Sequence, residues 1–336
     1  MREKAAMLIA ALLCAVAVPA RAQDCASLHY VTGVSMTPTG GNVMTVPVTI
    51  DGMPKAMMLD TGGAVSELTR TTLGEFNLPE RVSPIKTYDV SGRLSRTLTQ
   101  VHRLELGSVD FTNLALQIDA DPDIGAPFSG LISDDLLSAY DVDIDFGSNR
   151  LNFFSTDHCA AGGGYWTTRP LAVVPFHISD SHIVLPIVLD GYHMSAIIDT
   201  GSSFTTMNSD IARYFFDLKP GSREMKRFYL GAGDAAQQVN YSHVFSNLSF
   251  TGVTVSNPFM IIVPGRALLD ELDPQWGHLP RRVSPPDVTI GMDILKTLHI
   301  YVAYKEHKLY ITRADKTAAD ALPPLGTSPG QPDSHL

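Results

Sequence analysis

The sequence predicts a mostly β protein built from two similar halves, and three repeated observations lead to this prediction. All three recur in the same order at a shift of 139 positions (199 − 60). Each half contains an apolar run (46–50 and 185–189), an Asp-Gly pair (51–52 and 190–191) and a second apolar run that ends in Asp-Thr-Gly (57–62 and 196–201). The pattern indicates a duplicated unit.

The apolar runs and the Asp-Gly pair between them are typical of a β-hairpin with a two-residue turn. The second strand of each hairpin then delivers Asp60 or Asp199 from a buried run. Burying a carboxylate costs free energy unless it has a partner or a task. Asp-Thr-Gly alone is a weak signal, because aspartate and glycine also make ordinary strand-to-turn junctions. The repeated register of turn and motif favours a pair of carboxylates that face each other.

These motifs resemble those of the aspartic proteases of the pepsin and retropepsin type. In that family each of two similar lobes or subunits supplies one Asp-Thr/Ser-Gly, and each lobe closes with an apolar-Gly segment, a short helix and a final strand. Matching segments occur here at 131–137 and 142–146, and at 289–295 and 298–302. One departure is Ser133, which stands where the second half has Gly291.

The resemblance implies a bacterial-type single-chain enzyme with two β-barrel lobes in a pseudo-twofold arrangement and the active site between them. It makes Asp60 and Asp199 the catalytic residues, with no cofactor and no metal. Two adjacent carboxyls cannot both ionise cheaply, so one shared proton is expected. The residues implied to support the site are Thr61, Gly62, Thr200, Gly201 and Ser202. The Ser202 side chain is a candidate hydrogen-bond donor to the Asp199 carboxyl. Gly63 stands at the same place in the first half and has no side chain to donate to Asp60.

Two further hairpins are candidates for flaps that close over a substrate, as in the family. The first spans 87–95 and includes Tyr88 and Gly92, and the second includes Tyr229 and Gly231. Turn chemistry does not reveal what a hairpin covers, so the alternative of ordinary surface hairpins stays open.

The predicted organisation places a secretory signal first, because basic residues, an apolar run and Ala-Arg-Ala follow one another. An insert at 265–287 has no counterpart in the first half, and it either lines a specificity pocket or decorates the surface. The predicted segments are a signal peptide (1–22), a first lobe (23–157), a Gly-rich linker (158–170), a second lobe (171–313) and a disordered tail (314–336).

Removing the signal changes the net charge from −10 to −12 (22 − 34). This charge argues against nucleic acid and anionic membrane surfaces as partners, and the apolar run is too short for a convincing membrane span. Cys25 and Cys159 are the cysteines that remain, and in an exported protein they are expected to form a disulfide rather than two free thiols.

Other chemistry-bearing residues are expected to be structural. The run 141–145 alternates aspartate with apolar residues but lacks the glycine and glutamate spacing of a calcium loop, so we expect a strand with an exposed acidic face. His177, His182 and His193 lie on or beside predicted strands and are expected to be structural histidines.

The sequence therefore predicts an exported, periplasmic or extracellular aspartic endopeptidase that acts on polypeptides as a monomer. Two alternatives remain. The first is a peptide-binding protein on the same scaffold that has lost turnover, with Gly63 and Ser133 as signs of drift. The second is a processing enzyme for one partner rather than a general degradative protease.

Overall fold

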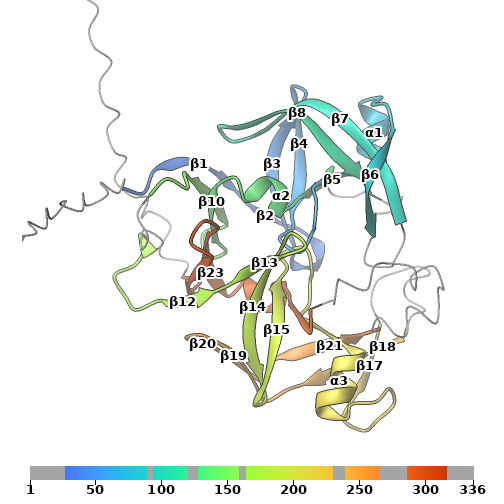
Figure 1. Ribbon diagram of the computed structural model, residues 1–336, viewed down its shortest axis with the longest axis vertical. Helices are drawn as coiled ribbons and strands as arrows, with labels where there is room; N and C mark the ends of the chain where they lie inside the picture. The colour runs from blue at the N-terminus through green and yellow to red at the C-terminus, as the bar shows by residue number, and fades with distance from the viewer. Residues whose placement is uncertain are drawn as a thin grey trace, which may run out of the picture.

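The protein is mostly β, and its strands form three sheets (Figure 1). The computed structural model describes residues 27–88, 94–119, 128–158, 164–229, 239–264 and 286–315. Figure 1 shows most of one sheet at the top, most of a second at the bottom and a third at the left, with helix α2 near the centre.

An eight-stranded sheet belongs to the first half of the chain, in the order β2-β3-β4-β9-β5-β8-β7-β6. Its strands are β2 (Thr37–Pro38), β3 (Met44–Ile50), β4 (Met53–Leu59), β5 (Glu67–Leu68), β6 (Arg81–Tyr88), β7 (Leu94–Leu106), β8 (Val109–Ile118) and β9 (Gly130–Ile132). β4 pairs in parallel with β9, which brings Leu59 beside Ile132.

A ten-stranded sheet belongs to the second half, in the order β17-β18-β21-β16-β22-β15-β14-β19-β20, and β13 also pairs with β14. Its strands are β13 (His177–Ser179), β14 (His182–Leu189), β15 (Tyr192–Ile198), β16 (Thr206–Asn208), β17 (Lys226–Tyr229), β18 (Val239–Val244), β19 (Asn247–Phe250), β20 (Val253–Ser256), β21 (Phe259–Val263) and β22 (Val288–Ile290). β15 pairs in parallel with β22, as β4 does with β9.

A six-stranded sheet takes strands from both halves, in the order β1-β11-β10-β23-β24-β12. At its centre β10 and β23 pair antiparallel, so the two halves meet through backbone hydrogen bonds. Its strands are β1 (Tyr30–Ser35), β10 (Asp141–Asp145), β11 (Arg150–Phe154), β12 (Ala172–Pro175), β23 (Leu298–Ala303) and β24 (Lys308–Arg313).

The two predicted Asp-Gly hairpins are confirmed. β3 pairs with β4, and β14 pairs with β15. Both residues of each turn have positive φ: 47° and 84° at Asp51 and Gly52, and 45° and 90° at Asp190 and Gly191. Two positive φ angles define the turn whose twist matches the flanking strands, and Asp-Gly is among its preferred sequences.

The helices are short and lie between strands. Thr69 caps α1 (Arg70–Glu75) by accepting a hydrogen bond from the Thr72 amide, and Asn208 caps α3 (Ser209–Phe216) in the same way through the Asp210 amide. The others are η1 (Gly40–Asn42), α2 (Asp134–Leu137) and α5 (Met292–Leu295). α2 and α5 stand at the places where both halves were predicted to carry a short helix.

The expected exposed acidic face of the strand at 141–145 is wrong, because all five residues of β10 are buried. Asp143 accepts hydrogen bonds from Asn152 Nδ2 (2.9 Å), Tyr165 Oη (2.5 Å) and His299 Nε2 (2.5 Å). Trp166 stacks on the His299 ring at 4.2 Å. Sequence alternation could not reveal this cluster, because Tyr165 and Trp166 come from the interlobe segment and His299 comes from the far end of the chain.

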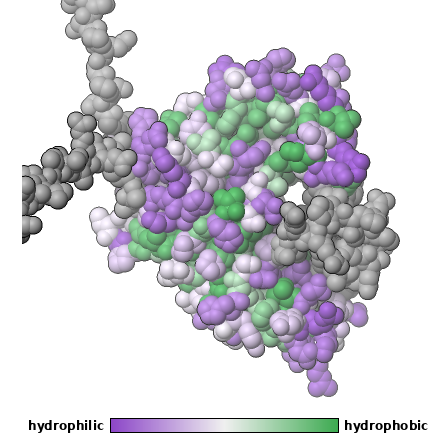
Figure 2. Space-filling model, viewed as in Figure 1, coloured by the Kyte–Doolittle hydropathy of each residue, from purple (hydrophilic) through white to green (hydrophobic). Residues whose placement is uncertain are grey.

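One large apolar cluster contains side chains from both halves, among them Leu59, Ile132, Ile198 and Ile290 around the ends of the motif strands. Polar and apolar residues alternate over the face of the molecule shown in Figure 2. In the part of the chain that the structure describes, no helix is long and apolar enough to span a membrane.

Candidate active site

Asp60 and Asp199 follow directly after β4 and β15. Each aspartate amide donates a 2.9 Å hydrogen bond to the last residue of the parallel neighbour strand, from Asp60 to the Ile132 carbonyl and from Asp199 to the Ile290 carbonyl. Equivalent pairs of parallel strands, β4 with β9 and β15 with β22, therefore fix the two aspartates in the same way.

The two threonines of the motifs tie the halves together by reciprocal hydrogen bonds. The Thr61 amide donates to Thr200 Oγ1 (3.0 Å), and the Thr200 amide donates to Thr61 Oγ1 (3.2 Å). Each hydroxyl in turn donates across the interface, Thr61 to the Ile198 carbonyl (3.0 Å) and Thr200 to the Leu59 carbonyl (2.7 Å). Both side chains are buried, at 1% exposure, so these bonds are shielded from water.

The two motif glycines allow the carboxyl groups to approach the opposite loop. A Cβ on Gly62 would lie 2.5 Å from Asp199 Oδ2, and a Cβ on Gly201 would lie 2.5 Å from Asp60 Oδ1. Contacts this short do not occur for real side chains, so any other residue at either position would push the carboxyl groups apart. The glycines are required by this close approach.

The carboxyls hydrogen bond to each other and to nearby amides. Asp60 Oδ1 accepts from the Gly62 amide (3.0 Å), and Asp199 Oδ1 accepts from the amides of Gly201 (2.9 Å) and Ser202 (3.0 Å). Burial raises the pKa of both carboxyls, and the Asp60 charge raises the pKa of Asp199 further. The pair is therefore arranged to share one proton.

His182 makes the surroundings of the two carboxyls unequal. Its Nε2 lies 2.9 Å from the Gly62 carbonyl in a hydrogen bond, and its charge lowers the pKa of Asp60. The position 139 residues earlier holds Val43, so the first half has no matching histidine. The expectation that His182 is only a strand histidine missed this contact, because it joins positions 120 residues apart.

The chain matches the family model described as aspartyl protease over residues 46–134 and 185–294. Each matched range contains one complete Asp-Thr-Gly motif. The chain belongs to the aspartyl protease family. No curated protein matches the chain.

Each half of this aspartyl protease family member braces its motif loop with a further aspartate. Asp135 Oδ1 accepts from the Ser66 amide (3.0 Å) and hydroxyl (2.7 Å). Asp293 Oδ1 accepts from the Thr205 amide (2.8 Å) and hydroxyl (2.7 Å). The equivalence of Asp135 and Asp293 inferred from the sequence agrees with these contacts.

Ser202 does not use its hydroxyl as expected. The amide of Ser202 donates to the Asp199 carboxyl, but its Oγ donates to the Phe204 carbonyl at 2.8 Å. The hydroxyl therefore stiffens the loop that follows the second motif, and the backbone carries the contact with the carboxyl. Sequence could not distinguish the two, since both partners lie within three residues of Ser202.

The sequence also missed Asp134, which lies behind the site. Its Oδ1 accepts from Tyr304 Oη at 2.7 Å, and it is 3% exposed. Burial raises the pKa of Asp134 to about 8, the Tyr304 hydrogen bond opposes this, and the charges of Asp60 and Asp135 add to it. The pKa of Asp134, a residue of the first half, therefore depends on the charge of Asp60.

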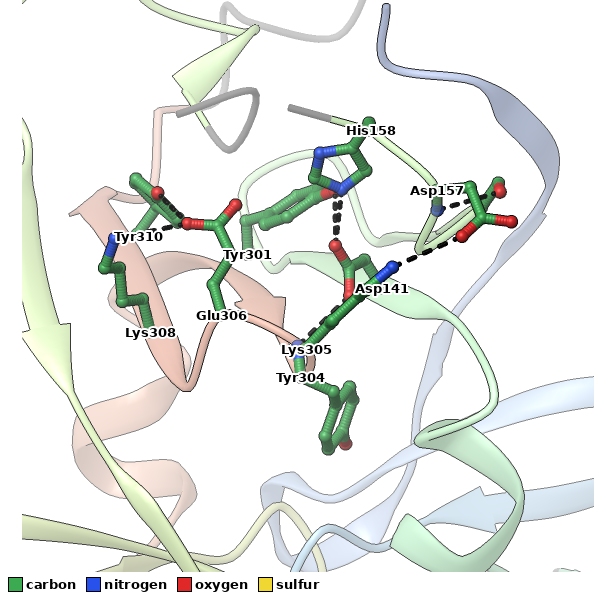
Figure 3. Close-up of polar contacts among 10 residues, drawn as sticks. Asp141, Asp157, His158, Tyr301, Tyr304, Lys305, Glu306, Lys308 and Tyr310 are labelled. Atoms are coloured by element: carbon green, nitrogen blue, oxygen red, sulfur yellow. Dashed lines mark hydrogen bonds and ion pairs between the residues drawn. The ribbon is translucent and has the colours of Figure 1, made fainter. Parts of the chain in front are cut away.

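Tyr304 connects Asp134 to a second buried group, shown in Figure 3. The Tyr304 amide donates to Asp141 Oδ1 (3.1 Å), while His158 Nε2 lies 2.6 Å from Asp141 Oδ2. Tyr301 Oη also donates to Asp141 Oδ2, at 3.3 Å. This chain of contacts links the back of the candidate site to the sheet shared by both halves.

The flap candidates are described only in part. β6 pairs with β7 up to Tyr88 and Leu94, and β17 pairs with β18 up to Tyr229 and Val239, so both predicted hairpins exist. Gly92 and Gly231 lie outside the described residues, as do Cys25, Cys159 and most of the 265–287 insert. What the hairpins cover and whether the disulfide forms therefore stay predictions.

Proposed function

We propose that the protein is an aspartic endopeptidase that hydrolyses peptide bonds with a water molecule activated between Asp60 and Asp199. The observation that carries the proposal is the reciprocal Thr61–Thr200 bonding, which holds two hydrogen-bonded carboxyls at the ends of matching strands. The matching strand pairs, turns and helices of the two halves support two lobes related by a pseudo-twofold axis through this contact.

The unequal surroundings of the two carboxyls favour one of them as the holder of the shared proton. We place it on Asp199, because His182 lies beside the first motif, hydrogen bonded to the Gly62 carbonyl, and its charge lowers the pKa of Asp60. Ionised Asp60 takes a proton from water, the resulting hydroxide forms a bond to the peptide carbon, and Asp199 donates its proton to the carbonyl oxygen. Breakdown of the tetrahedral diol then transfers a proton to the departing amine. No covalent enzyme intermediate forms.

The test is a digest of a peptide library with the purified mature protein, from acidic to neutral pH. We expect internal cleavage that disappears in Asp60→Asn and Asp199→Asn. Cleavage that persists in either variant contradicts the two-aspartate mechanism. Binding of peptides without cleavage by the wild type favours the alternative, a peptide-binding protein on this scaffold. Cleavage restricted to one sequence favours a processing enzyme.

We further propose that the protein is exported and carries a Cys25–Cys159 disulfide, which would join the start of the mature chain to the segment after β11. The signal-like residues 1–22 and the two remaining cysteines support this proposal. Thiol labelling of the denatured, unreduced mature protein is expected to find no free thiol. Two labelled cysteines would contradict it, and so would a protein that retains residues 1–22 in the cell.

A further inference from the structure

The first lobe buries a serine hydroxyl whose purpose the proposed mechanism does not explain. Ser133 is fully buried, at 0% exposure, and no group among the described residues hydrogen bonds its Oγ. It precedes α2, but its side chain makes no capping bond there. A buried hydroxyl without a partner costs free energy, so its presence needs a reason beyond local structure.

The hydroxyl lies beside the Asp60 carboxyl, in space that Gly63 leaves open. A Cβ on Gly63 would overlap Ser133 Oγ and would lie 3.0 Å from Asp60 Oδ2. Ser133 Oγ and Asp60 Oδ2 therefore both border the space where that Cβ would stand. A side chain on residue 63 and the Ser133 hydroxyl exclude each other there.

The second lobe has the opposite arrangement. Ser202 stands at the position of Gly63, and Gly291 stands at the position of Ser133. A Cβ on Gly291 would lie 2.5 Å from the Phe204 carbonyl carbon and 2.9 Å from the Ser202 oxygen. Both obstacles are backbone atoms, so the second lobe cannot carry a serine at 291. The Gly63 and Ser133 departures from the second lobe are thus one linked change rather than two signs of drift.

We propose that Ser133 is a positioning residue for Asp60: its hydroxyl, which has no partner among the described residues, turns toward Asp60 Oδ2 when that carboxyl ionises and donates a hydrogen bond that stabilises the carboxylate. The proposal rests on the proposed function, because it explains why Asp60 rather than Asp199 serves as the base. Donation to an ionised acceptor is stronger than donation to a neutral one. In the second lobe the corresponding serine donates to the Phe204 carbonyl instead, so Asp199 lacks this stabilisation.

Several charged and titratable groups face Asp60 and influence its pKa together with Ser133. Asp199 is hydrogen bonded to Asp60, Asp134 interacts with its charge from α2, and His182 lowers its pKa from β14. Burial outweighs the lowering by the Asp199 hydrogen bond and by His182, and it raises the pKa of Asp60. A hydroxyl donor at Oδ2 acts in the same direction as His182, and it is uncharged.

The experiment compares wild type, Ser133→Ala and a matched control, Thr99→Val. Thr99 is also fully buried in the first lobe, but its hydroxyl donates to the Pro79 carbonyl at 2.9 Å. The first readout is the pH titration of the Asp60 carboxyl by ¹³C NMR in the free protein, with the signal assigned by its loss in Asp60→Asn. The second is the pH profile of kcat/KM on a peptide that the library digest finds to be cleaved.

Ser133→Ala is expected to raise the Asp60 titration midpoint and the acidic limb of kcat/KM by about one pH unit. Near the limb, kcat should fall roughly tenfold while KM changes by less than about twofold. Thr99→Val should leave both midpoints in place. Ser133→Cys, which keeps the size but donates weakly, should lie between wild type and Ser133→Ala.

An unchanged Asp60 midpoint in Ser133→Ala overturns the proposal, whether or not the protein cuts peptides. If no peptide is cut but the midpoint rises, the proposed function fails while the role of Ser133 at Asp60 stands. A second pair of variants tests the geometry through protein stability and does not depend on peptide cleavage. Gly63→Ala should lower the melting temperature, and adding Ser133→Gly should restore most of the loss. If Gly63→Ala alone is as stable as wild type, Ser133 does not occupy that space and the proposal is wrong.

Discussion

The two halves of the chain are most alike where they touch each other and least alike one layer behind the aspartates. The Thr61–Thr200 bonds and the Asp135 and Asp293 braces repeat almost atom for atom. Behind Asp60, in contrast, stand Ser133 and the acidic Asp134, where the second half has Gly291 and the apolar Met292.

This difference separates two tasks. The repeated contacts bring the carboxyls together, and symmetry suits that task because both loops must approach equally closely. Placing the shared proton on one particular carboxyl requires the opposite, since two carboxyls in identical surroundings have no preferred base. His182, Ser133 and Asp134 each occur on only one side of the pair, so they can distinguish Asp60 from Asp199.

The largest expected effect tests whether the two halves act as one unit. Asp60→Asn and Asp199→Asn should each lower kcat at least about 1000-fold, and the double variant should be little worse than either single one, because each removes the same shared proton. Melting temperatures should stay level or rise, since the amide relieves repulsion between buried carboxyls. A variant that keeps near wild-type turnover would show that the aspartate it replaces is not needed for hydrolysis.

The reciprocal Thr61 and Thr200 contacts should contribute equally to the free energy of unfolding. Thr61→Val and Thr200→Val each leave one backbone amide and one carbonyl buried without their bonds, at a cost of roughly 2–5 kcal/mol in the free energy of unfolding. Urea denaturation of both variants should give similar losses. A large loss in one and none in the other would contradict the equivalence of the two threonines.

Asp134 should make the first lobe sensitive to pH. Burial raises its pKa from the ordinary 3.8 to about 8, so its contribution to stability is full below pH 3.8 and is lost as the pH rises toward 8. Asp134→Asn should therefore stabilise the protein at pH 8 by about 2–5 kcal/mol and have little effect near pH 4. The measurement is urea unfolding at both values.

Asp157→Asn is the control for this comparison, because the Asp157 side chain is 86% exposed. Its effect should be small at both pH values. If Asp134→Asn shifts stability equally at pH 4 and pH 8, the carboxyl does not titrate in this range and the asymmetry behind Asp60 has another origin.

The smallest expected effect comes from His182. His182→Gln keeps a donor for the Gly62 carbonyl but removes the charge that lowers the pKa of Asp60. The Asp60 pKa should rise, which moves the acidic limb of kcat/KM upward by a few tenths of a pH unit, as expected for a partly screened charge. A limb that moves downward would reverse the assigned direction.

The sequence alone determined the elements whose cause is local or repeated. The Asp-Gly turns require positive φ, the apolar runs supply the strands, and the repeat indicates two facing motifs, so Asp60, Asp199 and the hairpins could be found without a structure. Turn tips such as Gly92 and Gly231 fall outside the described residues, and their role stays a prediction.

Only the tertiary structure decided the environment of these residues. The contacts of His182 with Gly62, of Asp134 with Tyr304 and of Asp143 with His299 join positions between 120 and 170 residues apart, and no local pattern encodes such pairs. The same reason explains the wrong expectation for 141–145: alternation shows which side chains share a face of a strand, but the partner strand decides whether that face is buried. The repeat in the sequence predicts the catalytic pair, and long-range packing makes its two members different.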